Sequence, residues 1–554
     1  MPTVDAYRRA PLANPIFVPL PDGSVQMTGM HGKMTEEALS MADIGVMSPL
    51  DAMLASKLGG YADLPPVPDV PVSAARLRED PQSFILLARA SLMAASATRN
   101  KESFSVLIDA MRTFLEVLPE LSQEQVFPLG ADALRLTSEL YRRTGLPFLL
   151  TILESLRAQL PDVSGIMHSF PFIKPYEPQD TTGMDEATTL YHERMERLAT
   201  GSLMADALAM SSFLALFSGS SRDGAASLAG LNALTRYHGV PTGAFTADPF
   251  LAGRDPARAT DLAALSAQIE ALADLIMASG NLAFIERLEQ LVFSALPDFF
   301  APSGIRALQP INRLPSDDSC TASRPDSAQL SALLRALYAV RRCVWVAKEE
   351  DEIALLMPMD GGCLFRVNGV PVRLTASVSG TFVRTVTIAL ETAQPVPFTL
   401  HLRVPAHASE ASISVNGGSA QAIETGAMFG IQRTFRTGDT IVFKTESLPR
   451  VESGYRGSLS VLCGAQLMAL PISTADVKWQ FALLADSALT PAEEDGELRV
   501  LAAATDADGW QAKNGFITPP PQGIPAGGMY QLTLLPFSDA TGRIAEFPCA
   551  AQFS

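Results

Sequence analysis

The feature that most constrains this chain is a long series of paired amphipathic segments between residues 81 and 346. Apolar residues recur there at spacings of three and four, and each segment ends at Gly, Pro or a polar cluster. The clearest pairs are 84–97 with 104–117, 131–143 with 147–160, and 261–278 with 282–296. Because short connections make neighbouring helices antiparallel, roughly ten or more such helices without strands between them predict an α/α toroid or an α-solenoid.

After Lys348 the pattern changes to a period of two, which is typical of β-strands. Alternating stretches occupy 385–390, 398–404 and 411–415, and Asn416-Gly417 follows the last of them as a hairpin turn. Several short strands at intervals of roughly 8–12 residues predict an antiparallel β-sandwich. We therefore expect a multidomain α+β chain with a lead-in segment over 1–75, a helical domain over 76–347 and a sandwich over 348–554. The stretch 519–528, rich in Pro and Gly, is expected to be a surface loop.

Composition excludes several functional classes. The 554 residues carry 42 Lys+Arg and 59 Asp+Glu, a net charge of −17, with no basic block to offset it. Such a surface repels nucleic acid and anionic membranes. The opening MPTVDAYRRAPLANPIF has no apolar core of a signal peptide, so we expect a cytoplasmic protein. The five cysteines are odd in number, widely spaced and never in a CxxC pair, which favours reduced thiols and gives no self-contained zinc motif.

Specific strings go further than periodicity. In the helical region they are YHGVPTGAFTAD at 237–248, LAGRDP at 251–256, TDL at 260–262, SGN at 279–281, RLE at 287–289, FSALP at 293–297 and SCTA at 319–322. In the β region they are LRVP at 402–405, VNG at 415–417, IQR at 431–433, GD at 438–439 and GAQ at 464–466. In order and spacing, over roughly 130–480, these strings resemble glycoside hydrolase family 127, the β-L-arabinofuranosidase family.

The resemblance implies an (α/α)6 barrel followed by a β-sandwich, with a pocket that removes terminal arabinofuranose with retention. It further implies a cysteine nucleophile held as a thiolate on zinc, beside a glutamate acid/base. The family pattern has Glu-x-Cys at the start of one helix, Cys-Cys in a later loop, and a histidine at the start of an earlier helix. Here these positions hold Asp261-Leu262-Ala263, Ser319-Cys320 and Thr200-Gly201. The acid/base position falls at Asp248-Pro249.

At most Asp261 and Cys320 remain of the four implied zinc ligands. Catalytic zinc sites use at least three protein ligands, so we expect that this chain binds no stoichiometric zinc and needs no other cofactor. Any hydrolysis would then use two carboxylates, with Asp248 as the acid and Asp261 as the nucleophile or base. This mechanism requires both side chains to face one cavity.

Each candidate catalytic residue also has a structural interpretation. Asp261 stands in the first turn of a strong helix, where the macrodipole favours an acidic residue, and Asp248 lies in a loop where solvated aspartates are common. Cys320 could be a packing residue. Ser319 would need a base, for which the nearest candidates are Asp317 and Asp318, both equally suited to a turn.

The two candidate substrate-binding residues are equally open to a structural role. His238 could line a sugar pocket or cap the end of a helix. Arg254 could bind sugar hydroxyls or pair with Asp255.

The leading hypothesis is a glycosidase that acts on a small glycoside, whether β-L-arabinofuranoside-like or related, with a small carbohydrate as its partner and a homodimer left open. One rival is a catalytically silent relative that serves as a carbohydrate-binding or assembly protein, with a pocket filled by Phe245, Phe250 or Met side chains. A weaker rival is an α/α-barrel lyase using Tyr237-His238.

Overall fold

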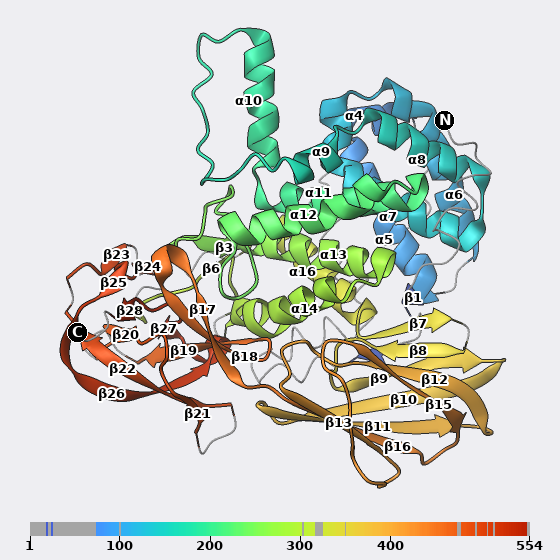
Figure 1. The fold of residues 1–554 in the computed structure, drawn as a ribbon. Helices are drawn as coiled ribbons and strands as arrows, with labels where there is room; N and C mark the ends of the chain where they lie inside the picture. Colours follow the sequence, from blue (N-terminus) through green and yellow to red (C-terminus); the bar gives the residue numbers. More distant parts are fainter. Residues whose placement is uncertain are drawn as a thin grey trace.

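The computed structural model describes residues 18–19, 24–25, 74–98, 101–301, 304–315, 325–349, 351–473, 478–492, 496–506, 508–513 and 516–550. It has a helical part followed by two β parts (Figure 1). The described helices are α4 (Ala74–Glu79), α5 (Pro81–Thr98), α6 (Lys101–Val117), α7 (Gln123–Thr144), α8 (Pro147–Gln159), α9 (Val163–His168), α10 (Glu186–Leu198), α11 (Gly201–Ser218), α12 (Ser221–His238), α13 (Leu262–Ser279), α14 (Leu282–Gln290) and α16 (Ser327–Arg342).

The helices form two layers. Helices α5, α7, α11, α13 and α16 pack in series against one another, and α6, α8, α12 and α14 each pack on a member of that series. This confirms the predicted helix pairs and gives the layering of an α/α toroid. A closed ring of six pairs stays a prediction, because part of the helical region lies outside the described residues.

Glycine ends three of the predicted helices, because it can adopt the left-handed backbone conformation that closes the last turn. Helices α7, α11 and α13 end at Gly145, Gly219 and Gly280, whose φ values of 65°, 63° and 63° lie in the left-handed region. An L side chain is strained there, whereas glycine closes the last turn without cost.

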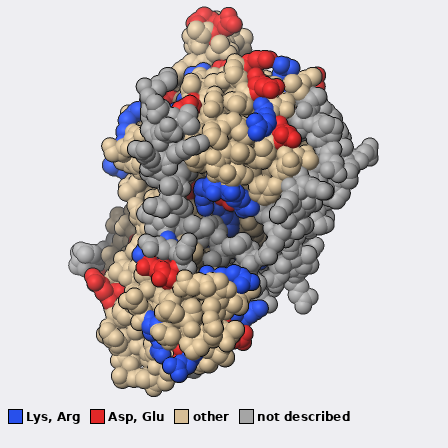
Figure 2. All heavy atoms as spheres, turned by 90° about the vertical axis from the view of Figure 1, so that its right-hand side faces the viewer, with Lys and Arg blue, Asp and Glu red and all other residues tan. Residues whose placement is uncertain are grey.

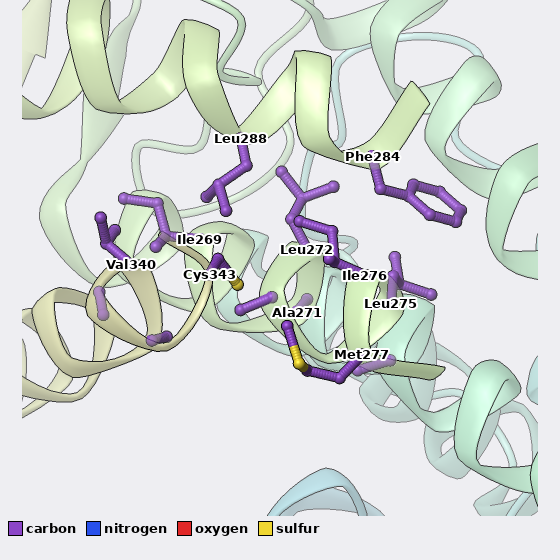
Figure 3. Close-up of a cluster of buried hydrophobic side chains, with 14 of the residues drawn as sticks. Ile269, Ala271, Leu272, Leu275, Ile276, Met277, Phe284, Leu288, Val340 and Cys343 are labelled. Carbon is purple, nitrogen blue, oxygen red and sulfur yellow. The ribbon is translucent and has the colours of Figure 1, made fainter. Parts of the chain in front are cut away.

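The predicted apolar stripe of α13 lies at the centre of the helical part. Figure 3 shows Leu272 and Ile276 of α13 facing Leu288 of α14, with Val340 of α16 and Cys343, which follows α16, on another side. Helices α11 and α13 are long and apolar enough to cross a membrane, but 72% and 83% of their apolar windows are buried inside the protein. These two helices are hydrophobic because neighbouring elements cover them on all sides inside the protein.

The middle β part is a sandwich of two sheets. One sheet has the order β1-β7-β8-β12-β15 and the other β14-β13-β16-β11-β10-β9-β2. The strands are β1 (Val18–Pro19), β2 (Ser24–Val25), β7 (Trp345–Glu349), β8 (Glu352–Leu355), β9 (Gly361–Val367), β10 (Val370–Ser379), β11 (Val383–Thr392), β12 (Val396–Arg403), β13 (Glu410–Val415), β14 (Gln421–Ala422), β15 (Met428–Phe435) and β16 (Thr440–Glu446). The predicted hairpin turn is confirmed, since Asn416 and Gly417 both have positive φ. The lead-in segment adds one edge strand to each sheet.

The second β part is built around a ten-stranded sheet with its own hydrophobic core, whereas the sandwich shares one core with the helices. The single sandwich expected over 348–554 is therefore two units, a division that strand periodicity does not reveal. Its strands are β17 (Pro449–Ser453), β18 (Leu459–Cys463), β19 (Gln466–Ile472), β20 (Phe481–Leu483), β21 (Leu489–Pro491), β22 (Leu498–Thr505), β25 (Gln522–Gly523), β26 (Pro525–Pro536), β27 (Gly542–Ile544) and β28 (Cys549–Ala550).

The surface loop expected over 519–528 is wrong over most of its length, because β25 occupies Gln522–Gly523 within it. Strand β26 already begins at Pro525, which pairs with Thr505 of β22 next to a register shift. A proline is tolerated at the first position of a strand, so the Pro/Gly signal marked where β26 begins.

Acidic and basic side chains are interspersed on the face shown in Figure 2, where Lys and Arg gather in one hollow between the helical part and the β parts.

Candidate functional site

The candidate site is built on the chain between the end of α12 and the start of α13. Helix α12 ends at His238, a loop follows, and β3 (Ala259–Asp261) pairs with β6 (Leu308–Pro310) before α13 begins. Within the loop, Ala247 forms an antiparallel bridge with Leu251 and a parallel bridge with Thr260. The loop is thus folded back against β3.

Asp261 caps helix α13. Its Oδ1 accepts hydrogen bonds from the backbone N–H groups of Ala263 (2.8 Å) and Ala264 (3.1 Å). Its Oδ2 accepts from Nε2 of Gln329 on α16, at 2.6 Å. Burial raises the pKa of Asp261, although these hydrogen bonds oppose the shift. The carboxyl is therefore held rigidly in a poorly solvated position.

Asp248 is held by Arg258. The arginine Nε lies 3.0 Å from both carboxylate oxygens, and the Ala259 N–H also donates to Oδ2 at 3.3 Å. The side chain of Asp248 is 20% exposed and that of Arg258 is 43% exposed. Asp248 is therefore a fixed, charge-paired carboxylate.

The fold brings these two aspartates onto neighbouring segments of the backbone. Asp248 and Asp261 each follow a residue of the parallel bridge between Ala247 and Thr260. Adjacent strands lie about 4.8 Å apart, so the backbone places the two residues side by side although 13 positions separate them. That both face one cavity stays a prediction, because the loop holding Ser319 and Cys320 lies outside the described residues.

The structure places His238 and Arg254 in structural contacts. His238 is fully buried, its Nε2 lies 2.6 Å from the Phe172 carbonyl oxygen, and its Nδ1 accepts from the Gly253 N–H at 2.9 Å. Both ring nitrogens are used by the backbone, so the ring presents no free nitrogen to a sugar or to lyase chemistry in this conformation. Burial lowers the His238 pKa, which keeps the ring neutral.

Arg254 joins the site loop to the second β part. Its Nε donates to the Gly239 carbonyl at 3.1 Å and its Nη2 to the Ser453 carbonyl at 3.4 Å. The neighbouring Asp255 accepts from Thr518 Oγ1 at 2.9 Å. No ion pair between Arg254 and Asp255 occurs among the described residues, because each binds a different partner.

The described residues do not fit the zinc site that the family resemblance implies. Ala263 has no donor atom, and both oxygens of Asp261 already accept hydrogen bonds. The absence of zinc stays a prediction, argued from this donor set.

A second cluster contains side chains that can bind a metal ion, but arginine side chains already pair with its carboxylates. Glu286, Glu289 and His407 bring ligand atoms within 4.8 Å of one another. Arg403, which is fully buried, pairs with both glutamates, and Arg384 lies 3.5 Å from Glu289. These cations already neutralise the carboxylates, so the cluster joins α14 to the sandwich and needs no metal.

Sequence reasoning missed Arg258, Gln329 and Glu546. Gln329 lies three residues after Asp326, and that spacing predicts only the local capping box, which is present. Glu546 is fully buried near the site loop, where its Oε1 accepts from the Tyr455 N–H and the Ser458 hydroxyl while Oε2 has no partner among the described residues. Burial raises its pKa to about 7. No local pattern signals either long-range contact.

A buried charge network crosses the inner helices. Arg135 of α7 pairs with Asp132, Asp206 of α11, and Glu270 and Asp274 of α13. Arg89 of α5 and Arg335 of α16 also pair with Glu270. Glu270 lies nine positions beyond Asp261, about 13 Å further along α13. Burial raises the pKa of Asp206 to about 7. This network ties the helices together below the candidate site.

Comparison with known proteins supports the family resemblance that the sequence predicts. Residues 361–446 match the model of the β-L-arabinofuranosidase GH127 middle domain. The fold matches a structure described as a glycoside hydrolase with a TM-score of 0.68 and 12% identity, covering 98% of this chain and 100% of the other. The predicted resemblance to glycoside hydrolase family 127 is confirmed by this family match.

Two further solved structures share this fold. A GH127 β-L-arabinofuranosidase from Geobacillus stearothermophilus T6 matches with a TM-score of 0.63 and 13% identity, over 91% of this chain and 89% of that one. A GH127 β-arabinofuranosidase matches with a TM-score of 0.55 and 12% identity, over 96% and 98%. No curated protein sequence matches this chain. At such low identity the structural matches describe the fold alone.

Proposed function

We propose that this chain is a glycosidase of the GH127 type that hydrolyses a small glycoside, β-L-arabinofuranoside-like or related, with two carboxylates and without zinc. The observation that carries the proposal is the bridge between Ala247 and Thr260, which sets Asp248 beside Asp261 at the start of α13. The family match and the poor fit of the zinc donors support it. Hydrolysis by paired carboxylates needs one protonated and one ionised group.

The contacts favour an exchange of the two roles expected from sequence. Asp248 forms an ion pair with the Arg258 guanidinium, whose Nε lies 3.0 Å from both carboxylate oxygens, and this contact suits a nucleophile or base. Asp261 is poorly solvated, which favours the neutral acid. We therefore assign proton donation to the leaving oxygen to Asp261 and the anionic role to Asp248.

The test is a screen of the purified protein on aryl glycosides, including both arabinofuranose anomers, with and without added zinc. We expect zinc-independent turnover of at least one glycoside. Asp261→Asn should reduce it at least about 100-fold, with little change in melting temperature because Asn caps a helix as well as Asp. Asp185→Asn is the matched control, since Asp185 is the N-cap of helix α10, outside the candidate site, and should leave turnover unchanged.

Cys320→Ala should retain activity within about tenfold, since losing a group outside the reaction costs less than about 1.4 kcal/mol of barrier. A loss of several orders of magnitude would make Cys320 the nucleophile and contradict the two-carboxylate proposal. Activity that appears only with zinc would contradict it as well.

The second candidate is the silent, carbohydrate-binding relative, and tight apolar packing favours it. A Cβ built on Gly201 would lie 2.3 Å from the Ala247 Cβ and 2.8 Å from the Ala264 Cβ, with Phe245 close by. The start of α11, where the family pattern has a histidine, is thus packed against the site loop. Calorimetric binding of a sugar that no aryl glycoside assay turns over would support this reading.

A further inference from the structure

The second β part contacts the site loop (239–258) beside the turn that joins β17 to β18. Arg254 of the site loop donates to the carbonyl oxygen of Ser453, where this turn (453–458) begins, at 3.4 Å. The site loop also carries Asp248, one of the two candidate catalytic carboxylates. The position of the turn therefore affects how firmly the candidate site is held.

The turn has an unfavourable backbone conformation. Arg456 has φ 52° and ψ 32°, which is the left-handed region that a residue with a side chain rarely adopts. Its guanidinium lies 4.9 Å from the centre of the Tyr455 ring. A turn with such a residue persists only when the surrounding structure holds it in place.

Glu546 makes the contacts that hold the turn. Its Oε1 accepts hydrogen bonds from the Tyr455 N–H, at 2.5 Å, and from the Ser458 hydroxyl. A Cβ built on Gly454 would lie 2.2 Å from the same oxygen, so the turn closes directly over the carboxyl group. The glutamate side chain thus fills the inside of the turn.

The backbone of Glu546 is tied to the strand that pairs with β3. Asn312 accepts from the Glu546 N–H at 3.0 Å and donates to the Glu546 carbonyl oxygen at 2.8 Å. Asn312 follows β6, and β6 pairs with β3, which ends at Asp261. Glu546 therefore connects the turn on one side with the strands of the candidate site on the other.

The second carboxyl oxygen of Glu546 makes this connection sensitive to a proton. Oε2 is buried and has no hydrogen-bond partner among the described residues. The charged and titratable groups that face the carboxyl are Arg254 and Asp255 of the site loop and Tyr455 of the turn. Arg254 and Asp255 act in opposite directions, and burial raises the pKa of Glu546 to about 7. A buried carboxylate without a cation of its own is costly, so the neutral acid is the form that fits.

We propose that Glu546 is a positioning residue for the candidate site, which holds the turn 453–458 and, through Arg254, the site loop for as long as its buried Oε2 carries a proton. When the proton is lost, Oε2 requires water or the Arg254 guanidinium. Either one requires the turn to move away from its present position. The effect on turnover rests on the proposed function, whereas the movement of the loop can be measured without it.

Hydrogen exchange of the full chain, followed by mass spectrometry at about pH 5.5 and about pH 8, tests the proposal. After correction for intrinsic exchange rates, protection of 239–258 and 453–458 should fall on the order of tenfold at the higher pH in wild type, because the opened turn releases the Glu546 proton more easily. Glu546→Gln keeps a neutral group of the same shape and should show a change of less than about threefold. Peptides from β11, which lies inside a sheet of the sandwich, are the internal control and should stay protected at both values. The same pH dependence in wild type and Glu546→Gln would overturn the proposal.

Asp255→Asn tests the coupling to the site loop. The Asp255 carboxylate raises the pKa of Glu546, and asparagine keeps an acceptor for the Thr518 hydroxyl. The pH at which protection is lost should therefore move to a lower value. Asp486→Asn is the matched control, because Asp486 is exposed on the second β part and should leave that pH unchanged. A midpoint that stays constant or rises in Asp255→Asn would contradict the proposed role of Glu546.

Turnover separates this inference from the proposed function. On a glycoside that the chain hydrolyses, Glu546→Gln and wild type should be equal at about pH 5.5, and the variant should be at least about twofold faster at about pH 8. Exchange that depends on pH in a chain without turnover would support the role of Glu546 and contradict the proposed function. Turnover with exchange that is independent of pH would contradict the role of Glu546 alone.

Discussion

At the scale of single residues, burial raises the pKa of several carboxyl groups in this chain. Glu546 is the clearest, since it is fully buried, its Oε2 has no partner among the described residues, and its pKa is raised to about 7 by burial. An unfolded glutamate ionises near 4.5. Between these two values the folded chain binds more protons than the unfolded chain, so stability falls as the pH rises.

We therefore expect Glu546→Gln to raise the melting temperature at pH 8 and to have little effect near pH 4.5. The gain in the free energy of unfolding at pH 8 has an upper limit of about 3 kcal/mol. Differential scanning calorimetry across this range measures it. A difference between variant and wild type that is the same at every pH would show that Glu546 does not change its charge on unfolding.

At the scale of elements, the inner helices are tied by ionic contacts as well as apolar packing. Arg135 is 7% exposed and faces four carboxylates on α7, α11 and α13. Removing one partner of a buried ionic network leaves uncompensated charge, which is far more costly than losing an exposed pair.

Arg135→Met should therefore lower the free energy of unfolding by about 3–5 kcal/mol, measured by urea denaturation. Arg222→Met is the control, because its pair with Asp162 is 55% and 63% exposed and should change the free energy of unfolding far less. Equal effects of the two substitutions would mean that the network is not what holds these helices together.

At the scale of the whole molecule, buried ion pairs cross both boundaries between the parts. Arg403 of the sandwich pairs with Glu286 and Glu289 of α14. Arg543 of the second β part pairs with Asp298 at the end of the helical part, at 2.6 Å. Burial raises the pKa of Asp298, but Arg543 and Arg313 outweigh that effect and lower it to about 2. The second β part has its own core, but Leu462, Leu467 and Phe537 also pack into the core of the helical part, so this pair is one of several links to the rest.

Asp298→Asn should uncouple that part, since it leaves Arg543 buried without its charge partner at a cost of about 3–5 kcal/mol. We expect one calorimetric transition for wild type and two for the variant. Glu120→Gln, which breaks the exposed pair with Arg78, should keep one transition. A single unshifted transition in Asp298→Asn would show that apolar contacts alone couple the parts.

The sequence by itself determined the helix pairs, the strands of the sandwich and the resemblance to GH127, because these depend on patterns within a few residues or on short strings. Periodicity of three and four fixed α5 to α8, α13 and α14, and glycine marked where helices end. Only the tertiary structure decided what the candidate residues do. Asp248, Asp261 and His238 find their partners 10, 68 and 66 positions away, in Arg258, Gln329 and Phe172. Such contacts depend on how helices and loops pack in three dimensions, and no local spacing records them.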